Sequence, residues 1–586
     1  MKQSIIYTMA LVGVLSLGSC ADDFLDQENT TNLNQSTFFD SDNALTAATA
    51  PLYNYVWNDF NGKAYYGMGD GRANNITAQY SDYIYPYTNF TDNSLSQGLA
   101  DAWNSLYSVV AQSNNVINNI KNYATSSCTE SAKLQATAEA RFMRGLAFWY
   151  IGSLWGGGII YTNTSDLVNS YSSAVPCPRE DLIQFAIRDM EFAAQNLPET
   201  AASAGRVTKY SAYGMLSRFY LTMAGLIKEG AYDPNNRDNV VTNFNRGTRD
   251  QYYLDLAADA AKKVIDCANY ELVPYADLFS NDLGKCNNNK ETLFQLQWNT
   301  GSTDAIGWGC NQSIEAFFGW STMVSDGTNW GGATYCSWDL WKEFNQDDNG
   351  TTESVRRHYS VASTGEEYPE FGYDDAGVPY TYGVTETPGN QGANIRKYVV
   401  GLNKVNGYSY KQSGGNNTYM MRLAEVYLNY AEAKLSNDAA QSTTDAEALR
   451  VFNLVRSRAA MPAKTSLTYE DIRHERRVEF AFEGLYWYDL LNRSYYKQND
   501  VVQYMNNQYR NASYGASSST YDGEKCGIYY LNGDYDVSNP PSVATATERN
   551  LVLQVPDADQ GKCPALKPDA STGLLNTTPY NFDDGQ

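Results

Sequence analysis

Apolar residues recur at helical spacing in two long parts of this chain. Within residues 420–435 five apolar positions fall at i, i+3, i+4, i+7 and i+8, which places them on one face of a helix. They are Leu423, Val426, Tyr427, Tyr430 and Ala431. Comparable spacing predicts helices over 102–120, 138–154, 181–197, 209–224, 254–267, 445–459 and 469–493. Small residues along these stretches allow helices to approach closely, as in helical repeats, but no exact repeat period is present.

Three other regions lack helical spacing and are rich in Gly, Asn, Ser, Thr and aromatic residues. They cover about 60–98, 281–418 and 494–586. Residues 291–298 alternate in the manner of a strand. Because long irregular segments are usually functional or disordered, and aromatic richness disfavours disorder, we interpret these regions as ordered binding loops. The sequence therefore predicts a mainly α-helical protein with a few short strands, whose helical scaffold covers about 42–280 and 419–493.

The first residues have the pattern of an export signal. A basic position precedes an apolar run over 5–17, which is too short to span a membrane. The run ends in Leu17-Gly18-Ser19-Cys20, which resembles a bacterial lipobox. We predict a lipoprotein signal peptide over 1–19, a lipidated Cys20, and a polar tether over 20–41. The alternative is an ordinary signal peptide with a chance cysteine. Acidic residues directly after Cys20 resemble a surface-export signal.

Composition restricts the possible partners. The net charge of −23 argues against binding to nucleic acid and against docking on an anionic membrane by charge. The chain has 47 Tyr, whose rings bury area while their hydroxyls form hydrogen bonds, as suits surfaces that bind polar ligands, although many will pack helices. Eight cysteines besides Cys20 permit disulfides, but their pairing cannot be deduced from the sequence. No CxxC is present, so a zinc site is not expected.

The sequence offers little support for catalysis. Its two histidines are His358, which we expect to be solvated, and His474, which we expect to be packed or hydrogen-bonded within a helix. No HExxH, GxSxG or Walker pattern occurs. A glycosidase-like pair of carboxylates is not readable without a fold. Residues 534–538 resemble part of a calcium loop but lack its glycine and distal Glu, so we expect no cofactor, with a structural Ca²⁺ there as the open alternative.

A series of motifs, in order, carries a resemblance to a known family. The most specific is 469–493, where a helix dense in acids and bases runs into Phe-Ala-Phe and then Glu483-Gly484 with an aromatic run. Further motifs occupy 140–158, 178–198, 206–212, 421–433 and 453–459, with a looser match at 551–556. Together they resemble the SusD/RagB family, the lipid-anchored nutrient-binding proteins of Bacteroidetes outer membranes. The resemblance covers nearly all of the mature chain.

The resemblance implies a tetratricopeptide-like helical superhelix with irregular regions laid over it, formed by a single domain over 42–586. It implies a capture protein and not an enzyme, anchored in the outer membrane and exposed at the cell surface. Its partner would be a TonB-dependent, SusC-like transporter, over which this protein closes as a lid. We interpret the charged residues of the motifs as scaffold ion pairs. They are Arg141, Arg144, Arg476, Arg477, Glu475, Glu479 and Glu483.

Two loop segments combine aromatic and polar residues in the way that sugar binding requires. A sugar ring has an apolar C–H face that stacks on aromatic rings and a hydroxyl rim that binds polar groups. We predict stacking by Tyr83, Tyr85, Trp308, Phe318, Trp320 and Trp330, and hydroxyl binding by Asp70, Arg72 and Asn75. Because neither segment has a basic cluster, a neutral glycan is favoured over an anionic one.

Two other functions stay open from the sequence. The same scaffold with the same aromatic loops could bind an extended peptide. A secreted glycoside hydrolase or esterase is the alternative of another class, and turnover by the purified protein would favour it.

Overall fold

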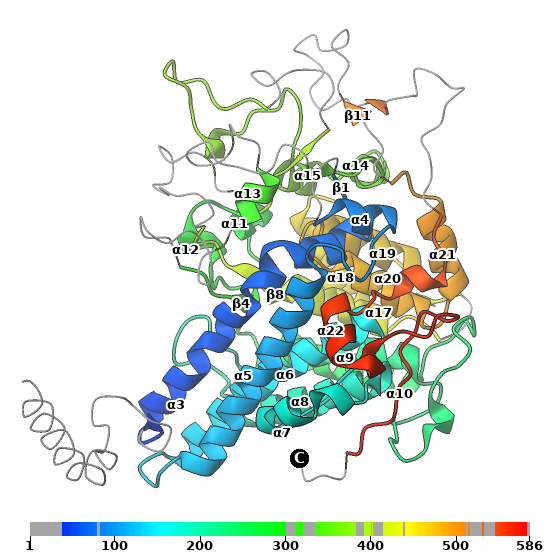
Figure 1. Ribbon diagram of the computed structural model, residues 1–586. Helices are drawn as coiled ribbons and strands as arrows, with labels where there is room; N and C mark the ends of the chain where they lie inside the picture. The colour runs from blue at the N-terminus through cyan, green and yellow to red at the C-terminus, as the bar shows by residue number, and fades with distance from the viewer. Residues whose placement is uncertain are drawn as a thin grey trace, which may run out of the picture.

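The computed structural model is mainly helical, in agreement with the predicted fold class (Figure 1). None of the described helices has the length and apolarity needed to cross a membrane. The predictions for the signal peptide over 1–19, for Cys20 and for the calcium-like segment over 534–538 lie outside the described residues, as does the predicted tether over 20–41 up to residue 37. At the end of that tether Phe39 is already buried in the scaffold. The structure describes residues 38–78, 83–299, 312, 314–319, 323, 334–382, 392–399, 401, 414–437, 440–510, 514–515, 530–531 and 545–582.

The N-terminal helical set is a succession of neighbouring pairs. α5 packs on α6, α6 on α8, α8 on α9, and α9 on α10, while α3 lies along α6 (Figure 1). This stepwise packing forms a superhelix, with each helix contacting mainly the helices before and after it. The bounds are α3 (Asp42–Thr49), α5 (Leu99–Tyr123), α6 (Glu130–Trp155), α8 (Arg179–Asn196), α9 (Lys209–Leu226) and α10 (Gln251–Ile265).

Small residues on α6 explain its close contact with α8. A Cβ atom at Gly145 would lie 3.0 Å from the carbonyl oxygen of Ala186, and one at Gly152 would lie 3.2 Å from Cβ of Leu182. The two backbones therefore approach more closely than larger residues would allow. Almost every residue of the second half of α6 is buried as a result.

The C-terminal helical set completes the scaffold, with α17 packed between α10 and α18. Its helices are α17 (Leu423–Ala433), α18 (Ala446–Arg458), α19 (Tyr469–Glu479) and α20 (Tyr486–Ser494). The predicted helix over 420–435 begins three residues late, because residues 420–422 end strand β8 (Thr418–Arg422). This strand pairs antiparallel with β4 (Thr292–Leu296), which confirms the strand predicted at 291–298.

The predicted single helix over 469–493 is two helices. α19 ends at Glu479, and a turn that includes Phe482 (φ 65°) and Gly484 (φ 70°) precedes α20. Backbone in this left-handed region cannot continue a helix. The break is part of a tertiary contact described below, which is why helical spacing alone does not reveal it.

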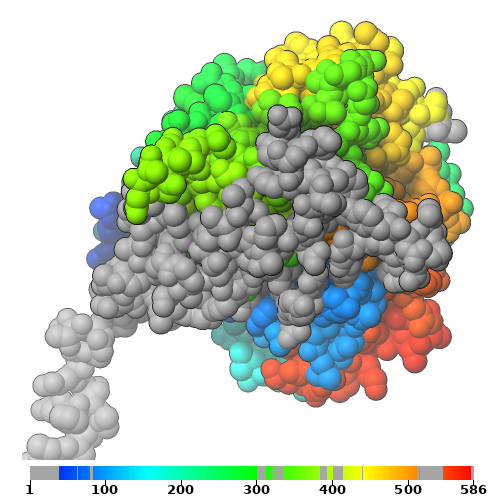
Figure 2. Space-filling model, turned by 90° about the horizontal axis from the view of Figure 1, so that it is seen from above, coloured from blue at the N-terminus to red at the C-terminus, as the bar shows by residue number. Residues whose placement is uncertain are grey.

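A layer of short elements covers one end of the scaffold. Its sheet has the strand order β1-β5-β7-β6, with antiparallel pairs throughout. We call this side of the molecule, at the top of Figure 1 and facing the viewer in Figure 2, the loop-rich face. Its elements are η3 (Phe60–Ala64), η4 (Gly67–Gly71), β1 (Ile76–Ala78), α4 (Tyr85–Asn89), α13 (Ile314–Phe318), β5 (Thr334–Cys336), α14 (Trp338–Phe344), α15 (Ser354–Ser360), β6 (Val361–Ala362) and β7 (Asn394–Ile395).

Shorter elements connect these parts. The ribbons pair β2 (Gly157–Gly158) with β3 (Cys177–Pro178), β9 (Ser442–Thr443) with β10 (Leu467–Thr468), and β11 (Tyr514–Gly515) with β12 (Tyr530–Leu531). The remaining short α-helices are α7 (Thr164–Ser170), α11 (Tyr275–Leu278), α12 (Leu283–Cys286), α21 (Gln498–Asn506) and α22 (Asp557–Lys562).

The cysteines of the described part are free thiols, so no disulfide joins them. Burial raises the pKa of Cys177 and of Cys286 to about 12, which keeps both thiols protonated and unreactive. The described cysteines are Cys128, Cys177, Cys267, Cys286, Cys336 and Cys563.

Candidate functional site

A buried network of charges lies between the scaffold and the loop-rich face. Arg422, at the end of β8, forms ion pairs of 2.8 Å with Glu291, 2.6 Å with Glu479 and 2.8 Å with Glu483. Lys397 forms a second pair of 2.8 Å with Glu483. Every side chain in this group is at most 2% exposed. Burial alone would raise the pKa of Glu479, but the surrounding guanidinium groups outweigh it and lower that pKa, so the carboxylate stays ionised.

The other charged residues of the motifs have the same role. Arg144 holds Asp189 at 2.7 Å, and Arg141 lies 3.2 Å from the same carboxylate. Further pairs formed by α19 include Glu475 with Arg356 and Arg456, Arg476 with Asp489, and Arg477 with Glu343. The prediction that these residues belong to the scaffold is confirmed.

Asp70 connects this network to the loop-rich face. Its carboxylate accepts hydrogen bonds from the backbone N–H of Phe482 (3.1 Å) and Gly484 (2.6 Å) and from Nδ2 of Asn75 (2.8 Å). Burial raises the pKa of Asp70 to about 6, although these donors favour its ionised form. A Cβ atom at Gly69 would lie 2.4 Å from the carbonyl oxygen of Gly484, so the two glycines are in close contact.

These two motifs, 69–75 and 479–484, therefore meet in one place. We call the group the buried joint; it consists of Gly69, Asp70, Asn75, Glu291, Lys397, Arg422, Glu479, Phe482, Glu483 and Gly484.

The predicted hydroxyl-binding residues are inside the protein. Asp70, Arg72 and Asn75 are 0%, 1% and 0% exposed. Arg72 pairs with Asp92 at 2.5 Å, donates to the carbonyl oxygen of Asn550, and lies against the rings of Phe90 and Trp487. The ligand-binding assignment of these three side chains is corrected, because all three are enclosed and bonded to protein partners. The glycine- and amide-rich sequence indicated a surface loop, but at this place the chain forms tight turns in the protein interior.

Tyr85 is the exposed aromatic residue that this interior supports. It begins α4 and is 44% exposed, whereas Tyr83 is half-buried with its ring close to Gly98. The underside of α4 rests on η4, where a Cβ atom at Gly71 would lie 3.2 Å from Cγ2 of Ile84 and 3.4 Å from Cγ2 of Thr88. Figure 2 shows the blue surface of the α4 region exposed on the loop-rich face. Tyr85 thus stands on a short helix that is fixed by the buried joint.

Phe318 is an anchor for the other predicted segment. It is 1% exposed and packs edge-on against Tyr66, with ring centroids 4.8 Å apart. Nδ2 of Asn394 donates to the carbonyl oxygen of Phe318 at 2.7 Å. Its assignment as a stacking residue is therefore corrected, because its ring is enclosed.

The other predicted stacking residues, Trp308, Trp320 and Trp330, lie outside the described residues. The described elements nearest them in the sequence, α13 and β5, are both held by buried contacts. Since α13 packs on Tyr66, directly before η4, it shares its support with α4.

One aromatic residue of this face escaped the sequence prediction. Trp338 is half-buried on the first turn of α14 and packs against Tyr514, with centroids 5.4 Å apart. Ser337 caps this helix, and Trp341 one turn later is buried. The available sequence signal was a serine that can cap a helix, followed by two tryptophans three positions apart. Residues at that spacing lie on the same side of a helix, and here that side borders both the core and the surface.

Both histidines have partners within the protein. His474 lies 3.0 Å from Glu343. Burial lowers the pKa of His474, but the hydrogen bonds to Glu343 and Glu353 and the nearby negative charge outweigh burial and raise this pKa to about 9. This confirms a hydrogen-bonded His474. His358 is only 32% exposed and stacks on Tyr368 at 5.0 Å, so it is less solvated than predicted. No group of three or more metal-ligating side chains was found within the described part of the chain.

Comparison with known proteins agrees with this architecture. The family model described as "SusD family" matches residues 290–531, and one described as "Starch-binding associating with outer membrane" matches 23–221. A SusD-like protein of Bacteroides ovatus is 34% identical over 599 residues, covering 100% of this chain and 99% of that protein.

Two solved structures illustrate the fold. One, described as a complex with a xylogluco-oligosaccharide, has a TM-score of 0.76 at 31% identity and covers 92% of this chain and 100% of that one. A laminarin-binding SusD-like protein has a TM-score of 0.61 at 18% identity, with 92% and 100% coverage, and shows the fold alone.

Proposed function

This chain belongs to the SusD family, and from that membership we propose that it captures a neutral oligosaccharide or polysaccharide at the cell surface. The glycan would lie on the loop-rich face and pass to a partner TonB-dependent, SusC-like transporter in the outer membrane. The description of the matching family model supports association with that membrane. The acyl anchor would be on Cys20.

The observation that carries the proposal is the exposed ring of Tyr85 on a rigid base. Its helix contacts η4, and η4 is held by Asp70 and Gly69 of the buried joint. A fixed aromatic ring loses little freedom when a sugar stacks on it, so its contact area contributes more fully to affinity. The relative that is 31% identical and holds a xylogluco-oligosaccharide supports a glycan as the ligand.

We further propose that the protein binds its ligand without chemical turnover. Asp70, whose pKa is raised by burial, is enclosed in the buried joint, whereas three other carboxylates of the loop-rich side, Glu343, Glu353 and Glu366, pair with arginines. The pKa of each of these three is lowered despite burial, because neighbouring cations outweigh desolvation. Such groups are poor general acids at neutral pH, because they have already lost the proton that a glycosidase acid must donate.

A binding screen of the purified protein tests this function. The panel contains xylogluco-oligosaccharides, laminarin, a strongly anionic polysaccharide and a peptide digest, measured by calorimetry and affinity gels. We expect saturable binding of a neutral glycan that is lost in Trp320→Ala or Trp308→Ala and retained in Tyr252→Ala. Tyr252 is a matched control because it is 46% exposed on α10, away from this face.

Other outcomes would redirect the assignment. Binding of peptides alone would favour a peptide ligand on the same scaffold. Binding of an anionic polysaccharide with no neutral glycan would contradict the charge argument, and product formation from any glycan would contradict a purely binding role. Co-purification of a tagged form with an outer-membrane transporter from native membranes tests the partner.

A further inference from the structure

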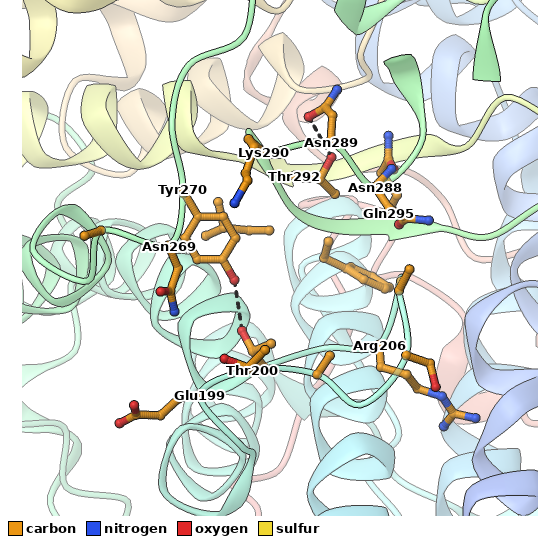
Figure 3. A pocket seen from close by; sticks show the side chains of 18 residues that line it. Glu199, Thr200, Arg206, Asn269, Tyr270, Asn288, Asn289, Lys290, Thr292 and Gln295 are labelled. Atoms are coloured by element: carbon orange, nitrogen blue, oxygen red, sulfur yellow. Dashed lines mark hydrogen bonds between the residues drawn. The ribbon is translucent and has the colours of Figure 1, made fainter. Parts of the chain in front are cut away.

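A hollow lies outside the loop-rich face, beneath the β4–β8 ribbon. Its volume is about 530 Å³, within the range of about 300–1,000 Å³ that is usual for small-ligand sites. Three segments line it: the connection from α8 to α9 (199–208), the chain after α10 (268–270), and the entry to β4 (288–295). Figure 3 shows these walls from close by. We call Tyr85 and the loop-rich face around it the candidate platform, and none of its described elements lines this hollow.

The walls are held in place by internal contacts. Gly205 (φ +85°) packs against Gln297 so closely that a Cβ atom would lie 2.5 Å from its side chain, which fixes the 199–206 loop on the ribbon. The hydroxyl of Tyr270 lies 3.0 Å from Oγ1 of Thr208, the residue that caps α9. Tyr210 packs edge-on against the Tyr270 ring at 6.3 Å. The aromatic wall is therefore preformed.

Some polar groups of the pocket are already hydrogen-bonded to the protein, and others are available to a ligand. The amides of Asn288, Asn289 and Gln295 already bond to neighbouring protein groups. Asn269 and Lys290 are exposed at the rim, and no side-chain hydrogen bond or ion pair to another described residue involves either. Figure 3 shows the Lys290 side chain pointing from the strand toward the Tyr270 ring.

The charge of the pocket is small. Arg206 pairs with Glu139, and Glu199 pairs with Lys209. Lys290 is left as the one lining cation outside the described ion pairs. An aromatic wall with an amide and an ammonium at its edge suits a sugar ring, whose C–H face stacks while its hydroxyls accept and donate hydrogen bonds. A strongly anionic ligand would need more cations than this pocket offers.

We propose that this pocket is a second glycan-binding site, which holds one or two rings of a neutral oligosaccharide on Tyr270, with Asn269 and Lys290 bonding to their hydroxyls. This inference rests on the proposed function and extends it to a location separate from the platform. A long glycan that engages both sites would be retained more strongly than by either site alone.

Chemical protection of Lys290 tests this site directly. The full purified chain is acetylated with a limiting amine reagent while xylogluco-oligosaccharide is titrated into the millimolar range, and each lysine is quantified by peptide mass spectrometry. We expect Lys290 to become at least threefold less reactive with saturation, while exposed Lys121 on α5 is unchanged. Tyr270→Ala should abolish this protection, and Tyr270→Phe, which retains the ring, should keep most of it.

The same assay separates the two proposals. Protection of Lys290 should persist in Tyr85→Ala, because that residue belongs to the platform. The second site is overturned if the reactivity of Lys290 does not change across the titration. It is also overturned if Lys290 is still protected in Tyr270→Ala, or if only a peptide digest protects Lys290. If variants of the platform lose calorimetric binding while Lys290 stays protected, the result concerns the platform and leaves the second site in place. Circular dichroism and the thermal midpoint confirm that each variant is folded.

Discussion

The buried joint and the loop-rich face differ in residue type, in burial and in purpose. The joint concentrates Arg, Lys and Glu at 0–2% exposure, where each charge has partners, while the face presents Tyr85 at 44% exposure on top of it. A charged motif is therefore no sign of ligand chemistry in this protein. Removing one buried partner should damage the fold, whereas removing an exposed ring should damage binding.

The largest expected effect comes from Arg422→Met. It leaves Glu291, Glu479 and Glu483 without their shared cation in the interior, so we expect a loss of about 3–5 kcal/mol in the free energy of unfolding. Chemical denaturation measures it. The control Arg450→Met removes an exposed pair with Glu447 and should cost at most about 1 kcal/mol. Equal losses in the two variants would contradict a structural role of the joint.

Gly484→Ala should be next in size. The left-handed backbone disfavours Ala by about 1–2 kcal/mol, and the added Cβ would lie 2.5 Å from the ring of Tyr65, for a total of about 2–4 kcal/mol. Gly230→Ala is a matched control, because its φ of +67° is nearly the same but nothing lies within 4 Å. The difference between their denaturation midpoints isolates the packing of the joint. No difference would show that the close contact is dispensable.

A pH titration should show a smaller effect through His474. Its folded pKa of about 9 exceeds the unfolded value of about 6.5, so the protonated ring stabilises the fold fully below pH ~6.5. This contribution is lost as pH rises through 9, and we expect about 1–3 kcal/mol of loss between pH 6.5 and 10. His474→Gln keeps a hydrogen-bonding group but cannot titrate. Its unfolding free energy should therefore depend less on pH, and identical profiles would contradict the linkage.

Tyr85→Ala should have the smallest effect on folding. Because the side chain is largely exposed, we expect the free energy of unfolding to change by less than about 0.5 kcal/mol. Glycan affinity should fall about tenfold, equivalent to about 1.4 kcal/mol, while Tyr85→Phe retains the ring and most of the affinity. Calorimetry with the glycan identified in the screen measures both. A large loss of stability would place Tyr85 in the scaffold.

Local patterns predicted the elements well and the buried contacts poorly. Helical spacing located both ends of α5, α8, α9 and α10, and the end of α6, to within one turn. These helices could be predicted because each buries a face whose apolar or small residues recur at helical spacing. The break at Phe480–Leu485 and the burial of Asp70 depend on a partner far along the chain, and neither leaves a periodic signal. The one clue was the glycine in each motif, since close backbone contact requires residues without a Cβ atom.

The identity of the site was predicted only in part for the same reason. Gly69-Asp70-Gly71-Arg72 has the composition of a surface turn, yet its turns are packed in the interior. Tyr85, which the sequence predicts to stack on a sugar, is exposed, because its neighbours Ile84 and Tyr87 supply the buried side of α4. Its contact with a glycan stays a prediction.

The joint also determines when this protein can finish folding. The bond from Gly484 to Asp70 spans 414 positions, and the bonds from Arg72 to Asn550 span 478. Contacts this distant in sequence form late, because a long loop must close first. A chain that is synthesised N-terminus first can assemble α5 to α10 early, but the base of its loop-rich face closes only after the last fifth of the chain has been made. Truncation within that last part should therefore disrupt folding at the other end of the sequence.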